Sequence, residues 1–235
     1  MRNLRIALFT VASLLALSTS AQTVDEVVDK HLEALGGKDK LSSIKTLRME
    51  TNLTIQGMDV PTIVTNVHNV GQRIDISVMG TENYFIVTPT AGWTFIPAMG
   101  QTAPQAIPDA ELKVNQQELD IQNPLLNYKD KGHKLELLGK ETIDGKEAFK
   151  VKMISKSGFE RTMFFDAQTY HLARIQQKAF VMGAEQDQTI IFSDYKKTED
   201  GYLFPYTISG IMGGDMVVSK VEVNKPVDEK IFKVN

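Results

Sequence analysis

The sequence predicts an α+β fold: a strongly curved antiparallel β-sheet, a half-barrel of about 11–12 strands, with helices covering its concave face. Three observations support this prediction. An amphipathic helix precedes the strands, alternating apolar and polar segments follow at intervals of about ten residues, and one helical excursion divides these segments into two sets. A meander this long has an apolar face to cover, and the two helical segments are the only covers that the sequence provides.

The first helix is contained in "TVDEVVDKHLEALGG". Thr23, followed three residues later by Glu26, indicates a capping box, and Gly36 is expected in the left-handed position that ends a helix. The apolar stripe at helical spacing consists of Val24, Val27, Val28, Leu32 and Leu35. A phosphate loop places its glycines after a strand and before a helix, so Gly36, Gly37 and Lys38 predict a helix end and not a nucleotide site.

The strands follow in two sets. The first set is predicted near 45–56, 59–69, 72–79, 82–88 and 92–97. The second set is predicted near 134–142, 146–154, 159–166, 171–181, 186–196, 202–211 and 216–224. Turn signals such as "DG" at Asp144 and Gly145 separate the strands. The pattern therefore predicts one long antiparallel meander with a single interruption.

The interruption, residues 98–133, holds a predicted helix from Pro108 to Ile121 with Leu112 and Leu119 on its apolar side. This lid-like segment is expected to be one of the two covers over the concave face. The closing "KPVDEKIFKVN" predicts a short turn that docks Ile231 and Phe232 against the sheet.

The N-terminus has the features of a secretory signal peptide. Arg2 and Arg5 precede an apolar run that is shorter than a membrane span, and Thr19 and Ala21 are small residues before a cut. Residues 1–21 are therefore predicted to be removed, leaving one domain, 22–235, in the periplasm; the alternative is an uncleaved anchor helix. Removal of the two arginines would take the formal charge from −3 to about −5. Nucleic-acid binding and stable membrane insertion are not expected of such a chain.

The sequence offers little catalytic chemistry. It has no cysteine, so disulfides, thiolate metal sites and a lipid on an N-terminal cysteine are excluded. Its four histidines show no metal-binding spacing, and no GxSxG elbow is present. Asp166 and His171 face each other across a predicted turn, but no nucleophile accompanies them. We expect no metal, no cofactor and no enzymatic activity.

Two strands are apolar on both faces, "NYFIVT" and "GWTFIP". Either they are buried on both sides, or one side forms the wall of a hydrophobic cavity. On the second interpretation, the ligand-binding residues of the cavity are Tyr84, Phe85, Trp93, Phe95, Met99 and Leu112.

Methionine, a flexible side chain that adapts to varied apolar partners, recurs beside glycine in the turns. In an unbroken meander, the turns with Met58, Met79, Met99, Met182 and Met212 fall on one rim, and the opposite rim is polar. Met58, Met79, Met182 and Met212 are therefore predicted to surround the mouth of the cavity. The alternative is that methionine ends these strands by chance.

Taken together, these features resemble the outer-membrane lipoprotein carrier family (LolA-like, including lipoprotein-sorting proteins). The resemblance rests on the pattern of elements from Thr23 to Asn235 and on "GWTFIP", "MFFDAQTYHLARIQQ", "FSDYKKTEDGYLFPYTISG" and "VDEKIFKVN". It implies a periplasmic carrier that shelters the acyl chains of lipoproteins or other lipids. The implied partners are this cargo and transport components of the inner and outer membranes.

Two features depart from the family pattern. No counterpart of the family's functional arginine is evident, although Arg48 and Arg73 are candidates. The stretch "ALGGKDKLSSIKTLRME" also resembles small periplasmic domains found beside zinc-peptidase-like proteins, whose motif is missing here. Two alternatives therefore stay open: a non-catalytic interaction module with a filled core, and a hydrolase or isomerase that uses Asp166 and His171, or His68.

Overall fold

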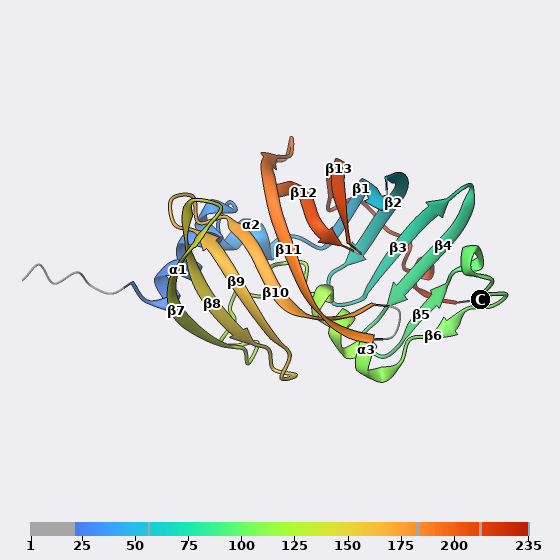
Figure 1. The fold of residues 1–235 in the computed structure, drawn as a ribbon, viewed down its shortest axis with the longest axis horizontal. Coiled ribbons are helices and arrows are strands. Elements are labelled where there is room, and N and C mark those ends of the chain that lie inside the picture. Colours follow the sequence, from blue (N-terminus) through green and yellow to red (C-terminus); the bar gives the residue numbers. More distant parts are fainter. Residues whose placement is uncertain (1–21, 56, 182–183, 212, 235) are drawn as a thin grey trace, which may run out of the picture.

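The computed structural model describes residues 22–55, 57–181, 184–211 and 213–234, which form a thirteen-stranded antiparallel sheet (Figure 1). The first strands are β1 (Thr46–Ile55), β2 (Met58–Val67), β3 (Gly71–Val78), β4 (Thr81–Val87), β5 (Gly92–Phe95) and β6 (Gln105–Ala106). The later strands are β7 (Lys134–Ile143), β8 (Lys146–Ile154), β9 (Glu160–Asp166), β10 (Leu172–Val181), β11 (Ala184–Lys197), β12 (Leu203–Ile211) and β13 (Gly214–Val223). The helical elements are α1 (Val24–Ala34), α2 (Lys38–Ser42), α3 (Asp109–Asn115) and the 3₁₀ turns η1 (Pro97–Met99), η2 (Gln116–Leu119) and η3 (Glu229–Phe232). The predicted signal segment, residues 1–21, lies outside the described residues.

The predicted curved sheet is confirmed, with one difference in how it is joined. The strand order is β6-β5-β4-β3-β2-β1-β13-β12-β11-β10-β9-β8-β7, so two meanders meet where the first strand pairs with the last. A single unbroken meander was the wrong expectation, because β7 lies at one edge of the sheet and β6 at the other. The sheet is not closed into a barrel. The two-residue β6 escaped prediction because it is too short to show alternation.

The sequence signals at both ends of α1 form as expected. The Thr23 hydroxyl accepts from the Glu26 N–H, and the Glu26 carboxylate accepts from the Thr23 N–H. At the other end, the Gly36 N–H donates to the Glu33 carbonyl and the Gly37 N–H to the Leu32 carbonyl, with positive φ at both glycines. These two bonds are those of a Schellman motif, so the glycine pair ends a helix.

Strand register assigns the side chains of the whole sheet to two faces. Cross-strand neighbours share a face, which places Leu47, Asn66, Gln72, Val87 and Gly92 in one row. Leu47 packs in the core beneath α1, and a Cβ at Gly92 would touch Leu112 of α3. Both helical covers therefore lie on the same face, which is the concave face of the sheet.

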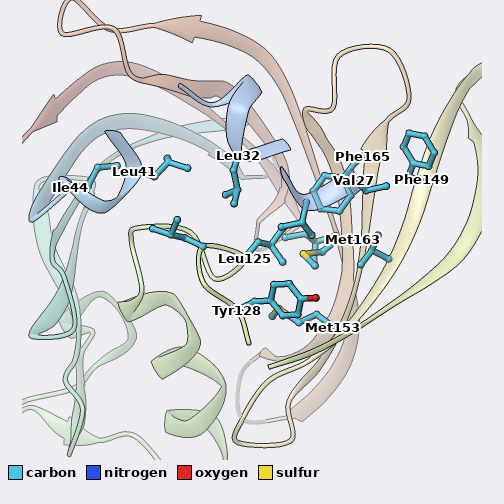
Figure 2. Close-up of a cluster of buried hydrophobic side chains, with 14 of the residues drawn as sticks. Val27, Leu32, Leu41, Ile44, Leu125, Tyr128, Phe149, Met153, Met163 and Phe165 are labelled. Carbon is cyan, nitrogen blue, oxygen red and sulfur yellow. The ribbon is translucent and has the colours of Figure 1, made fainter. Parts of the chain in front are cut away.

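The main core lies beneath α1, α2 and the segment 121–128, against β8, β9 and β10. Figure 2 shows Val27 and Leu32 of α1 directed toward Leu125, Met163 and Phe165. These five side chains are almost completely buried. Burial of apolar area on this scale is the main source of stability for the fold and fixes α1 on the concave face.

The predicted helix at 108–121 is confirmed as α3 continued by η2. Leu112 and Leu119 are buried with Val87 and Ile107 in a second, smaller cluster. Figure 1 shows α3 beside β5, far along the sheet from α1. Since α3 also contacts β10, it reaches across the concave side from one half of the sheet to the other.

The C-terminal turn docks as predicted, but on the opposite, convex face. Gly71 has the opposite parity to Gln72, and a Cβ at Gly71 would lie 2.6 Å from the ring of Phe232. The Arg73 guanidinium donates to the Ile231 carbonyl at 3.0 Å and lies over the ring of Tyr84. The C-terminal turn thus covers part of the convex face of β3.

Candidate functional site

The candidate site is a strip of apolar side chains on the concave face that no cover fully buries. Its members, here called the concave strip, are Ile55, Ile74, Ile76, Val78, Phe85, Ile208, Ile211 and Met216, all partly exposed. They come from β1, β3, β4, β12 and β13, so the strip spans the junction of the two meanders. Partly exposed apolar surface inside a curved sheet is suited to contact an apolar ligand.

Five of the six residues predicted to line a cavity fall into two groups, and the sixth, Met99, is exposed in η1. Phe85 lies in the concave strip, and Leu112 packs on Gly92 on the same face. Three aromatic residues lie instead on the convex face, where Tyr84 pairs with Phe95 and Trp93 pairs with Ile86. The structure therefore does not bring the six residues into one lining, and their contact with a ligand stays a prediction.

Of the methionines predicted to lie on one rim of the sheet, Met58, Met79 and Met99 are among the described residues. Met58 begins β2, Met79 lies in the β3–β4 turn and Met99 lies in η1, so all three lie at the rim of the sheet where β1, β3 and β5 end. These side chains are 50%, 92% and 69% exposed, respectively. Because β13 runs antiparallel to β1, the described ends of β10 at Val181 and of β12 at Ile211 lie at this same rim, but Met182 and Met212 are outside the described residues. That these methionines form a mouth stays a prediction.

Met79 occupies a backbone position that does not suit it. Met79 and Gly80 form a two-residue hairpin turn in which both have positive φ, 50° and 79°. Such turns favour Gly, which has no Cβ, or Asn, whose short polar side chain can hydrogen-bond to the nearby backbone; other side chains are strained there. We predict that Met79→Asn raises the free energy of unfolding by about 1 kcal/mol, measured by urea denaturation.

The matched control for Met79 is Met58→Asn. Met58 is also exposed but lies within β2, without positive φ. Here the substitution should give no gain, because asparagine is depleted in strands. Equal effects at the two positions would contradict the strain at Met79.

The first catalytic alternative, Asp166 with His171, does not assemble as a dyad. The Asp166 carboxylate accepts from the N–H groups of Gln168 and Thr169 and so shapes the turn between β9 and β10. The His171 ring stacks on Tyr195 at 4.4 Å between ring centroids. Both side chains therefore serve the local structure.

The second catalytic alternative, His68, has a carboxylate nearby. Its Nδ1 lies 3.8 Å from Asp120 Oδ1, too far for a hydrogen bond. Burial lowers the pKa of His68. Among the residues that the structure describes, no three His, Asp or Glu side chains group as a metal site.

The arginines considered from the sequence both lie on the convex face. Arg48 pairs with Glu50 and Glu222, and Arg73 holds the C-terminal turn. The arginine that reaches the lid-like segment is Arg161 on β9, whose Nη2 donates to Glu118 of η2 at 3.1 Å. A signal for it was present: Arg161 alternates with Met163 and Phe165, which are core positions, so a charged residue occupies the buried face of its strand.

Comparison with known proteins supports the fold. The sequence matches no protein-family model and no curated protein sequence. Among solved structures, the chain is similar to a LolA superfamily protein from Nitrosomonas europaea, with a TM-score of 0.57 and 12% identity over 91% of this chain and 98% of that one. It is also similar to an outer-membrane lipoprotein-sorting domain from Vibrio parahaemolyticus, with a TM-score of 0.54 and 14% identity over 88% and 94%.

A third similar structure is a DUF1329 family protein from Desulfovibrio piger, with a TM-score of 0.51 and 11% identity over 91% of this chain and 98% of that one. In the described part of this chain, no helix is long and apolar enough to span a membrane. At these identities the likeness is one of fold alone. The chain has the curved-sheet fold of the LolA superfamily structures.

Proposed function

We propose that this chain is a periplasmic carrier that binds the acyl chains of lipoproteins or other lipids and passes them toward the outer membrane. The observation that carries the proposal is the concave strip, an apolar surface left partly open between two helical covers. Acyl chains need apolar area and no catalyst, and burial contributes about 0.8 kcal/mol per methylene. The fold shared with a lipoprotein-sorting domain supports the same cargo class.

The cargo is tested by mass spectrometry of the protein purified from the periplasm without detergent. Native and denatured spectra are compared, and bound molecules are extracted into organic solvent. A co-purifying lipid or acylated peptide would support the carrier and give the chemistry of its cargo. A clean apo mass, together with no uptake of a fluorescent acyl probe, would instead favour the non-catalytic interaction module.

The location of the acyl chain is tested by two neighbouring substitutions on β13. Met216 faces the concave side, paired with Leu53, and Val217 faces the convex side, paired with Asn52. We predict that Met216→Glu weakens binding of an acyl probe at least tenfold, because it would place a carboxylate against an apolar chain. Val217→Glu is the matched control, since Val217 is half-exposed on the other face. Equal loss in both variants, or no loss in Met216→Glu, would refute this location.

A further inference from the structure

A pocket of about 600 Å³ lies between the segment 116–133 and the β8–β9 turn. Three cationic side chains line it, Lys131, Lys156 and Arg161, against one carboxylate, Asp120. Its lining also includes the His133 ring and the Ser157 hydroxyl. The pocket therefore has an excess of positive charge and of hydrogen-bond donors.

Arg161 is the most constrained of the three cations. It is only 6% exposed, and one of its nitrogens, Nη2, is paired with Glu118. Its Nε–H is buried and has no hydrogen-bond partner among the described residues. A buried donor without a partner is costly, because it has lost water and gained nothing in return. Arg161 lines the pocket, so a bound acceptor atom that reached its Nε–H would remove that cost.

The other two cations of the pocket, Lys131 and Lys156, differ in how far they are already paired. Lys131 is fixed by Asp120 and by the Asn123 carbonyl, so its charge is largely offset. The Lys156 ammonium makes no ion pair within the described part of the chain and is exposed. The backbone N–H of Lys156 donates to His133 Nδ1 at 3.1 Å, which leaves the proton of the neutral ring on Nε2.

The environment keeps His133 neutral. Burial is the largest cause of the lowered pKa of His133, and the positive charge of Lys131 and Arg161 lowers it further. His133 therefore offers an N–H donor without adding charge. Because Glu118 offsets Arg161 and Asp120 offsets Lys131, the excess of positive charge comes from Lys156.

We propose that this pocket binds an oxyanion of the phosphate type, either inorganic phosphate or the phosphate group of a larger ligand. A guanidinium and an ammonium with adjacent neutral donors offer more hydrogen bonds than the two oxygens of a carboxylate can accept. A phosphate carries about −1.5 to −2 charge near neutral pH, so the unpaired Lys156 ammonium and the adjacent Arg161 guanidinium attract it. The site does not depend on acyl binding, because its residues lie outside the concave strip.

The test is titration calorimetry of the full chain with sodium phosphate at low ionic strength. Lys156→Gln is the informative variant, since an exposed lysine can be replaced without disturbing the core. Lys146→Gln is the control, an exposed lysine at the start of β8, whereas Lys156 lies in the turn that follows the end of β8. We expect saturable binding by the wild type and by Lys146→Gln, and binding about five- to tenfold weaker in Lys156→Gln.

Two outcomes would overturn the proposal: no saturable phosphate binding by the wild type, or equal binding by all three proteins. A shift of the His133 ring signals in NMR spectra on adding phosphate would place the anion in this pocket, whereas unchanged signals would refute that location. The source of the phosphate is resolved with lysophosphatidic acid below its micellar concentration. Competition between this lipid and phosphate would indicate a lipid headgroup as the ligand; binding of phosphate without competition would indicate a free phosphate.

These results can be told apart from a failure of the carrier function. Met216→Glu should leave phosphate binding unchanged, and Lys156→Gln should leave uptake of an uncharged acyl probe unchanged. Loss of both activities in either variant would show that the two sites are not separate and would overturn the independent oxyanion site.

Discussion

Protonation of His31 should lower the free energy of unfolding by about 3 kcal/mol as the pH falls from 7 to 4. His31 is 2% exposed on the inner side of α1, and burial lowers its pKa from 6.5 to about 4. Its Nδ1 donates to the Tyr170 carbonyl at 2.8 Å, and its Nε2 accepts from the Asn123 amide at 3.2 Å. The neutral ring thus joins α1 to the β9–β10 turn and to the lid-like segment.

The direction of this pH dependence follows from the pKa values of His31 in the unfolded state, 6.5, and in the folded state, about 4. Between pH 6.5 and 4 the unfolded state binds a proton at His31 and the folded state does not. Stability is therefore lost as the pH falls through this window, at up to about 1.4 kcal/mol per pH unit. Above pH 6.5 the residue contributes no pH dependence, because its ring is neutral in both states.

The measurement is urea unfolding of the wild type and of His31→Gln at several pH values. The variant should be less stable at pH 7 because it loses packing against Phe165, but its stability should fall less on acidification. NMR titration of the wild-type ring reports the folded pKa directly. Parallel pH profiles, or a ring that titrates near pH 6.5, would contradict the burial of a neutral His31.

Removal of the Phe232 ring should cost about 3–5 kcal/mol of unfolding free energy. Phe232 is 4% exposed and packs on Gly71, where the strand has no side chain to hold the ring away. The same contact predicts that Gly71→Ala destabilises the protein by about 1–3 kcal/mol, because its Cβ would overlap the ring.

A double-mutant cycle tests this contact. In the Phe232→Ala background, Gly71→Ala should cost little, because the atoms that it would overlap have been removed. Phe232→Leu serves as a control that keeps an apolar side chain and should cost less than Phe232→Ala. Additive effects of Gly71→Ala and Phe232→Ala in urea unfolding would show that the C-terminal turn does not dock on β3.

The sequence by itself determined the local elements of this fold. Three local features depend only on residues close in the chain: the capping box at Thr23, the helix end at Gly36, and the apolar–polar alternation of the twelve longer strands. Their energies depend on neighbours three or four residues away, or on a period of two, so they can be seen in the sequence. The buried position of Phe232 was also predictable, as an apolar pair in a polar tail.

Only the tertiary structure decided the features that depend on contacts between residues far apart in the chain. Pairing of β1 with β13 brings together residues more than 150 positions apart, and no local pattern specifies it. The sequence also did not determine which face of the sheet carries Tyr84, Trp93 and Phe95. Covers lie on both sides of this region: α3 packs on the concave face of β4 and β5, and the C-terminal turn packs on the convex face of the neighbouring β3. The role of Arg161 arises only where η2 crosses β9. Alternation predicts which side chains are buried, but the packing of the whole sheet determines which element covers them.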